Sequence, residues 1–187
     1  MLNISKKLVL ASKSPRRREL LKSIGVKFVV DPSDFEEKEE HETPRELALH
    51  NAIGKAEEIA LRHDNALILG VDTVVAIDEH QIGKPKNDKD AKRILNLLHG
   101  RTHEVITAIC LIDTETGKRK TGVSKTLVTM DNMEEWEMNE YIASGEGADK
   151  AAGYAIQGLG ALFIKKISGD YFNVVGLPLN LLRRMLQ

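Results

Sequence analysis

The spacing of apolar residues changes repeatedly along the chain between the pattern of a strand and that of a helix. Short β-branched or apolar runs predict strands at residues 8–11, 26–30, 66–77, 104–112 and 120–130. Apolar residues three or four positions apart predict helices at residues 15–24, 44–62, 88–99, 133–143 and from Pro178 onward. Predicted strands and helices therefore interleave along the chain, with two strands in direct succession at 104–112 and 120–130.

Turn and cap residues mark where these elements begin and end. Ser14 and Pro15 are placed to start one helix and Gly25 to end it, while Asp88 is expected to cap another. Two hairpins are predicted, one turning at residues 116–117 and the other joining 161–167 to 171–175. Interleaved helices and hairpins favour an α/β fold with a mixed sheet over a purely parallel one.

Length and charge narrow the function classes. The 187 residues suit a single domain, 1–187, and the formal net charge of -1 argues against broad binding of nucleic acid. The N-terminal apolar run, residues 8–11, is too short for a signal-peptide core or a membrane span. The one cysteine, Cys110, falls in an apolar run and is interpreted as a core residue. A protein without membrane contact, in the reducing cytoplasm, is expected.

Three consecutive arginines, Arg16 to Arg18, stand in the first turn of a predicted helix. Cations are unfavourable at that end of a helix, because its free N–H groups and dipole are already positive. Ser12 and Ser14 precede them in a short polar loop after a strand, which is a common geometry for binding phosphate. The alternative is that the arginines point into solvent. No Walker loop occurs in the chain.

A single carboxylate, Asp72, interrupts the apolar strand at 66–77. Such a group is costly to bury unless it is paired, hydrogen-bonded or bound to metal, and Gly70 beside it permits close approach to the backbone. The acidic segment around Glu36 and Glu37 is either a solvated face or a source of a second carboxylate for a divalent cation. Sequence spacing does not decide whether Glu37 and Asp72 meet.

Other polar residues are weaker candidates. Lys84 in Gly-Lys-Pro and Lys55 on a helix could bind phosphate, and Gln157 among glycines could read the edge of a base. Each also has an ordinary interpretation, as a surface lysine or a flexible turn. The histidines show no zinc-binding spacing, and no serine has the setting of a hydrolase nucleophile.

Taken together and in order, these segments resemble the Maf family of nucleoside triphosphate pyrophosphatases. The resemblance is carried by collinear motifs over nearly the whole chain, namely Leu8–Arg17, Glu36–Glu37, Lys55, Gly70–Thr73, Gly83–Pro85, Arg101–Val105, Asp149–Ala151, Tyr154–Gly158 and Gly169–Pro178. It implies an elongated mixed sheet flanked by helices, as in inosine triphosphatases, with two lobes and a central cleft. It further implies a cytoplasmic homodimer that uses Mg²⁺ or Mn²⁺.

The resemblance also implies roles for individual residues. It makes Asp72 the catalytic acidic residue, either as proton acceptor or as metal ligand, and Glu37 the second carboxylate for the metal. It implies phosphate binding by Ser12, Ser14, Arg17, Lys55 and Lys84. The substrate-discriminating positions correspond to Arg16, Thr73 and Gln157, the residue types of the branch that acts on dTTP and UTP.

Val71, Ala152–Gly153 and Ala155 depart from the common family pattern and bear on loop shape and base preference. Two alternatives stay open. One is clearance of modified nucleotides, including 7-methyl-GTP. The other is a non-catalytic role in septum formation and cell division.

Overall fold

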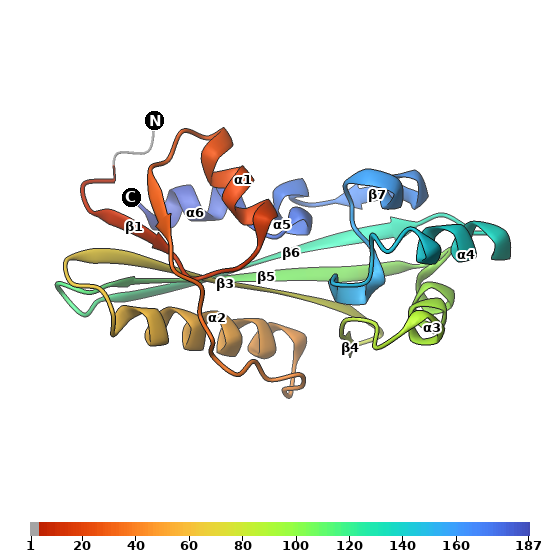
Figure 1. Ribbon diagram of the computed structural model, residues 1–187, viewed down its shortest axis with the longest axis horizontal. Coiled ribbons are helices and arrows are strands. Elements are labelled where there is room, and N and C mark those ends of the chain that lie inside the picture. Colours follow the sequence, from red (N-terminus) through yellow and green to blue (C-terminus); the bar gives the residue numbers. More distant parts are fainter. Residues whose placement is uncertain (1–3) are drawn as a thin grey trace.

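The computed structural model of the protein describes residues 4–187, which form one elongated sheet with helices on both faces (Figure 1). The strands are β1 (Lys7–Leu10), β2 (Phe28–Val30), β3 (Ala66–Ile77), β4 (His80–Ile82), β5 (Thr102–Asp113), β6 (Arg119–Met130) and β7 (Ile164–Ser168). The helices are α1 (Pro15–Ser23), α2 (Pro44–Ala60), α3 (Asp88–Leu98), α4 (Glu135–Ala143), α5 (Tyr171–Val175) and α6 (Leu179–Met185), with short 3-10 turns η1 (Ala151–Gly153) and η2 (Gly158–Phe163).

The sheet is mixed, as the sequence predicts. Its strand order is β2-β1-β3-β5-β6-β7, with β4 paired to β3. The β2-β1-β3 part is parallel and every other pairing is antiparallel. Among the described residues, no helix is long and apolar enough to cross a membrane.

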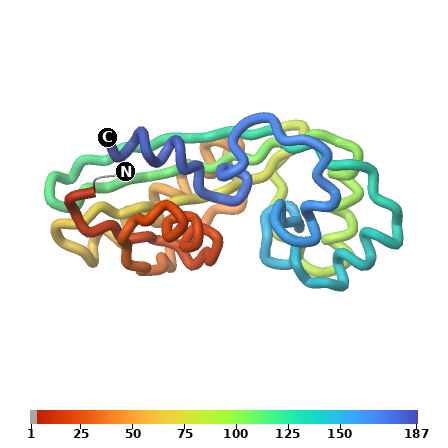
Figure 2. Tube along the Cα trace, turned by 90° about the horizontal axis from the view of Figure 1, so that it is seen from above, coloured from red at the N-terminus to blue at the C-terminus, as the bar shows by residue number. Residues whose placement is uncertain are grey.

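The long strands β3, β5 and β6 run through two lobes that share the sheet (Figures 1 and 2). In the first lobe α2 covers one face, while α1, α5 and α6 lie on the other. The second lobe is built on the far halves of the same strands, where α3, α4 and η1 enclose a separate apolar core that includes Val75, Ile94 and Met138. Each face of the first lobe has its own core as well. The strands therefore position two walls of side chains on either side of a middle segment.

That middle segment lies on an open edge of β3. Strand β1 pairs with β3 only as far as Leu69, and β4 begins to pair with it at Val75. Between these points, at residues 70–74, the edge has no strand partner within the described part of the chain. The carboxyl end of β1 opens into the same gap, and this is where α/β sheets commonly bind ligands.

Gly70 fixes the distance between this segment and α2. A Cβ atom at Gly70 would lie 2.2 Å from the carbonyl oxygen of Ala52 and 2.9 Å from the backbone nitrogen of Ala56. Glycine therefore lets α2 pack against the backbone of β3. The close packing brings Lys55, on the same helix, to the level of the next inward-facing residue of the strand, Asp72.

The predicted second hairpin is wrong. Residues 164–168 form β7, but residues 171–175 form helix α5 instead of a returning strand. Asp170 caps the helix by accepting a hydrogen bond from the Phe172 amide at 2.8 Å. The buried Asn173 side chain accepts from the Thr107 amide and donates to the Val105 carbonyl, so tertiary contacts override the strand propensity of the segment.

Smaller predictions also need correction. Asn87, not Asp88, caps α3, because its side chain accepts a hydrogen bond from the Asp90 amide. The helix predicted from residue 133 begins at Glu135, with Glu134 in a capping box. A hairpin that was not predicted joins β3 to β4 through Asp78 and Glu79, both in the left-handed region. Cys110 is buried in the core as predicted.

Candidate functional site

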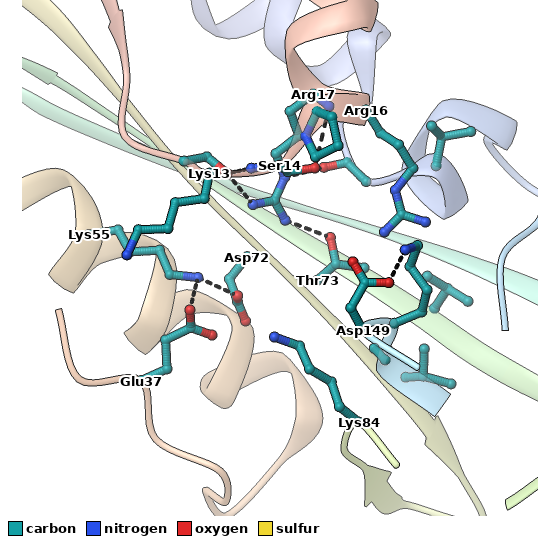
Figure 3. Close-up of a pocket in the computed structure, with 18 of the residues that line it drawn as sticks. Lys13, Ser14, Arg16, Arg17, Glu37, Lys55, Asp72, Thr73, Lys84 and Asp149 are labelled. Carbon is teal, nitrogen blue, oxygen red and sulfur yellow. Dashed lines mark hydrogen bonds and ion pairs between the residues drawn. The ribbon is translucent and has the colours of Figure 1, made fainter. Parts of the chain in front are cut away.

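A cavity of about 540 Å³ lies over the open edge of β3. One wall comes from the first lobe, through the loop after β1, the acidic loop before α2, and α2 itself. The opposite wall comes from the second lobe, through residues 149–154 and Lys84. Nine of the ten predicted site residues line it (Figure 3), namely Ser12, Ser14, Arg16, Arg17, Glu37, Lys55, Asp72, Thr73 and Lys84.

Two carboxylates converge on one lysine at the base of the cavity (Figure 3). The Lys55 ammonium lies 2.7 Å from Asp72 Oδ1 and 3.0 Å from Glu37 Oε1. The side chains of Lys55 and Asp72 are each only 9% exposed, whereas Glu37 is half-exposed. The buried Asp72 carboxylate is thus paired with a charged partner, which compensates the cost of burying it.

The acidic loop carrying Glu37 is anchored to α2 by two contacts. The buried amide of Asn51 accepts a hydrogen bond from the backbone N–H of Lys38 at 2.9 Å and donates to its carbonyl at 3.0 Å. The ring of Phe35 lies against Gly54, where a Cβ atom would come within 2.2 Å of the ring. These contacts place Glu37 next to Lys55, although the loop itself has no regular secondary structure.

Arg17 is a structural part of the site. Its guanidinium donates to Gly176 O at 2.9 Å, Ser12 Oγ at 2.9 Å, Val71 O at 3.0 Å and Thr73 Oγ1 at 3.1 Å. Burial lowers the pKa of this guanidinium, while the Asp72 and Glu37 carboxylates oppose that shift. Most of its donors are therefore already bonded to protein, and it joins α1, β3 and the end of α5.

The loop between β1 and α1 presents hydroxyl groups to the cavity. The N-cap of α1 is Ser14, whose Oγ accepts from the Arg17 amide, and Ser12 Oγ accepts from the Ser14 amide at 3.3 Å. The amino end of α1, which is the positive end of the helix dipole, adjoins these hydroxyl groups. This wall of the cavity therefore favours an anion.

Arg16 and Lys84 add positive charge to the cavity. Figure 3 shows Arg16 extending across the cavity toward Asp149, and Lys84 pointing into it from the second lobe. Partial burial lowers the pKa of Arg16, and the nearby Asp149 carboxylate acts in the opposite direction. Asp149 itself pairs with the adjacent Lys150, whose hydrogen bond holds the pKa of that carboxyl below its ordinary value.

Thr73 belongs to a directed chain of hydrogen bonds. Its hydroxyl receives a bond from Arg17 and lies 3.0 Å from the hydroxyl of Thr107, which in turn donates to the Asn173 carbonyl. Because the Thr107 hydroxyl donates its one hydrogen to the Asn173 carbonyl, the Thr73 hydroxyl must be the donor in its bond to Thr107. The Thr73 hydroxyl can then only accept a further bond from a ligand.

Apolar side chains also line the cavity. They include Val75, Val105, Ile156, Val174 and the ring of Tyr154. The Tyr154 hydroxyl lies 2.6 Å from Nε2 of His103, a side chain that is 1% exposed. Burial lowers the pKa of His103 to about 4, so the imidazole is neutral at pH 7. The cavity therefore offers both charged and apolar side chains to a ligand.

The two carboxylates beside Lys55 suit a hard divalent cation. Glu37 Oε2 and Asp72 Oδ2 remain largely free, and Mg²⁺ is commonly held by one or two carboxylates together with substrate phosphates. Within residues 4–187, no three His, Cys, Asp or Glu side chains gather closely enough to hold a metal alone. The residues thus fit a cation shared with a phosphate ligand.

Sequence reasoning and structure differ on a few residues. Gln157 is exposed at the start of η2 and is not among the residues that line the cavity. Asn51, Asp149 and Lys150 take part in the site but were not predicted as site residues. A signal for Asn51 existed, since it interrupts the apolar alanine face of α2 four residues before Lys55.

Comparison with known proteins finds relatives that match nearly the whole chain. The chain is 48% identical over 185 residues to the dTTP/UTP pyrophosphatase of Dictyoglomus thermophilum, covering 98% of this chain and 96% of that protein. It is 46% identical over 178 residues to the protein of the same name from Syntrophus aciditrophicus, covering 95% and 87% respectively. The corresponding protein of Bacillus mycoides is 43% identical over 183 residues, covering 97% and 95%.

Among solved structures, the fold is similar to the Ham1 protein of Staphylococcus aureus. The TM-score is 0.55 with 18% identity, over 97% of this chain and 98% of that one, a likeness that concerns the fold alone. The family described as Maf-like protein matches residues 7–187. With that match and the relatives above, the chain belongs to the Maf family.

Proposed function

We propose that this protein hydrolyses dTTP and UTP to the nucleoside monophosphate and pyrophosphate with the help of Mg²⁺ or Mn²⁺. The observation that carries the proposal is the lining of the cavity, which combines two carboxylates and several cations with apolar side chains. A nucleoside triphosphate likewise combines a highly charged triphosphate with a less polar nucleoside. The names of the relatives supply the substrate class.

The triphosphate would lie along the charged wall. Ser12, Ser14 and the amino end of α1 offer hydrogen bonds to phosphate oxygens, while Lys84 and Arg16 supply charge from either side. Fixed donors of this kind stabilise the negative charge that develops on phosphate oxygens during transfer. Arg17 holds Ser12 and Thr73 in place rather than contacting phosphate with most of its donors.

In the proposed reaction a water oxygen forms a bond to the α-phosphorus, and the bond from that phosphorus to the β-bridging oxygen breaks. Asp72 Oδ2 is the carboxylate oxygen that can accept a hydrogen bond from the water, since Oδ1 is engaged by Lys55 and the Asn51 amide is 3.5 Å from Oδ2. Glu37 and Asp72 would hold the divalent cation. Such a cation supplies charge neutralisation on the phosphate oxygens.

Thr73 supports a preference for uracil and thymine over cytosine. Its hydroxyl can accept one more hydrogen bond but has no hydrogen left to donate. At the N3 position uracil and thymine carry an N–H donor, whereas cytosine carries an acceptor, so only uracil and thymine can bond to the Thr73 hydroxyl through N3. Arg16 and Gln157 are proposed to contribute to the same choice, with Gln157 needing to turn toward the cavity.

The test is pyrophosphate release by the purified protein with Mg²⁺ or Mn²⁺ across ATP, GTP, CTP, UTP, dTTP and 7-methyl-GTP. Fastest turnover of dTTP and UTP supports the proposal. Preference for 7-methyl-GTP or for modified pyrimidine triphosphates would redirect it to clearance of unusual nucleotides. No turnover of any of them would favour a regulatory role in septum formation.

Two further expectations accompany the proposal. The protein is proposed to act in the cytoplasm as a homodimer. Light scattering coupled to size-exclusion chromatography tests the second point, because a mass near 20.8 kDa would show a monomer instead.

A further inference from the structure

Lys55 stands where a cation between the two carboxylates would be most stable. Its ammonium bonds to Asp72 Oδ1 and Glu37 Oε1, the two groups proposed to hold the metal. With two carboxylates and one ammonium, this cluster has a formal charge of -2 + 1 = -1. The lysine therefore already provides half of the positive charge that a divalent ion would bring.

The lysine cannot simply swing away with its helix. The contact of Gly70 with Ala52 and Ala56 holds α2 against β3, and the Lys55 side chain is 9% exposed. The acidic loop is equally fixed through Asn51 and Lys38. A divalent ion entering this cluster would face the ammonium at a separation of a few ångströms, where like charges repel strongly in a partly buried site.

A triphosphate changes that balance. Its oxygens bring several negative charges to the wall formed by Ser12, Ser14 and Lys84, next to the cluster. These negative charges can attract the Lys55 ammonium toward a phosphate oxygen. They also balance the positive charges of the ammonium and of the divalent ion. Lysine is suited to such a move, because its ammonium is a compact charge on a flexible stem.

We propose that Lys55 keeps a divalent cation out of the Glu37–Asp72 pair until a triphosphate is bound, so that metal and nucleotide enter together. This inference rests on the proposed function. It assigns Lys55 a second task beside phosphate binding, which is to set the order of binding.

The test is binding of Mn²⁺ alone to the nucleotide-free protein, measured from the electron paramagnetic resonance signal of free Mn²⁺. Lys55→Met removes the repulsion between the ammonium and the ion, so it should raise the association constant by about ten-fold or more. Lys55→Arg keeps the charge and should bind no more tightly than the natural protein. Lys38→Met removes a charge from the exposed neighbour of Glu37 and controls for net charge.

A double variant identifies the site that gains affinity. If the new Mn²⁺ site uses the carboxylate pair, Lys55→Met combined with Asp72→Asn should lose the gain. The inference is overturned if Lys55→Met binds Mn²⁺ no better than the natural protein, or if Lys38→Met produces the same gain. Lys55→Gln serves as a second neutral variant if thermal unfolding shows that Lys55→Met is not folded.

The outcome is separable from the proposed function. Mn²⁺-dependent hydrolysis of dTTP by the natural protein, without tighter Mn²⁺ binding by Lys55→Met, would remove the binding-order role and keep the reaction. Tighter Mn²⁺ binding by Lys55→Met, with no hydrolysis by the natural protein, would keep the role of Lys55 and remove the reaction.

Discussion

Asp72 and Thr73 are adjacent on β3, yet they anchor the site to opposite faces of the sheet. The Asp72 carboxylate bonds to Lys55 of α2, and the Thr73 hydroxyl bonds to Arg17 of α1. Successive side chains of a strand point to opposite faces, so one dipeptide on an open edge is bonded to helices on both faces of the sheet.

Replacement of Asp72 by asparagine should lower kcat for dTTP by about 100-fold or more, because the amide is a poor proton acceptor and metal ligand. Circular dichroism should show a folded protein, and steady-state pyrophosphate release measures the rate. Asp64→Asn, in an exposed turn, is the matched control and should retain full activity. Near-normal turnover of Asp72→Asn would contradict both roles considered for Asp72.

Gly70→Ala should destabilise the protein by about 1–3 kcal/mol, since the added methyl group would overlap the Ala52 carbonyl and push α2 off β3. The same shift would draw Lys55 away from Asp72 and lower activity. Urea unfolding measures the first effect. Gly83→Ala, with no atom within 4 Å of the added group, should stay within about 0.5 kcal/mol of the natural protein. Equal stability of the two variants would refute the close packing.

Arg16 and Arg17 should respond differently to replacement by glutamine. Arg17→Gln removes bonds to Gly176, Ser12 and Thr73 and should cost about 2–3 kcal/mol of unfolding free energy. Arg16→Gln should leave stability nearly unchanged and raise KM for dTTP about ten-fold, because this side chain extends into the cavity. Urea unfolding and initial rates distinguish the two. A reversed pattern would mean that Arg17 is the substrate ligand.

Thr73→Val should reduce the preference for UTP over CTP by about ten-fold, because valine cannot accept a hydrogen bond from N3–H. Thr73→Ser keeps the hydroxyl and should keep the preference, which controls for changes in the surrounding packing. The ratio of kcat/KM for the two nucleotides is the quantity to compare. An unchanged ratio in Thr73→Val would place the choice of base elsewhere, with Arg16 or Gln157.

His103 should make the protein less stable in mild acid. Its pKa is about 4 in the folded protein and 6.5 when unfolded, so between these values only the unfolded chain binds the proton. The unfolding free energy should therefore fall as pH decreases from 6.5 to 4, by up to about 3 kcal/mol. Urea unfolding at pH 7 and pH 4.5 measures the difference. The His103→Phe variant should show a smaller dependence, and an equal one would exclude His103 as its source.

Much of the fold follows from local sequence signals. The strand at 66–77 and the helix from Pro44 are long and strongly patterned, and both form nearly where expected. The strand prediction for residues 171–175 is wrong although Tyr-Phe-Asn-Val-Val favours a strand. Asp170 and Asn173 stabilise a helix there through contacts with β5 and β6. Those partners lie more than 40 residues away and cannot be seen in a local pattern.

The site was harder to predict than the fold for the same reason. Sequence singles out Asp72 as an anomalous charge and Glu37 as one of several acids, but only packing shows that both reach Lys55. The role of Asn51 depends on a loop with no regular pattern. The sequence also does not distinguish Arg17 from its two arginine neighbours. Only the structure shows that its guanidinium donates to the backbone carbonyls of Gly176 and Val71.

The most direct test of the proposed reaction is hydrolysis of dTTP in ¹⁸O-labelled water, with the products analysed by mass spectrometry. Attack on the α-phosphorus, beside Asp72, predicts one ¹⁸O atom in dTMP and none in pyrophosphate. Label in pyrophosphate would mean attack on the β-phosphorus, and dTDP with labelled orthophosphate would mean attack on the γ-phosphorus. Either of these results would contradict the placement of the triphosphate along Ser12, Ser14 and Lys84.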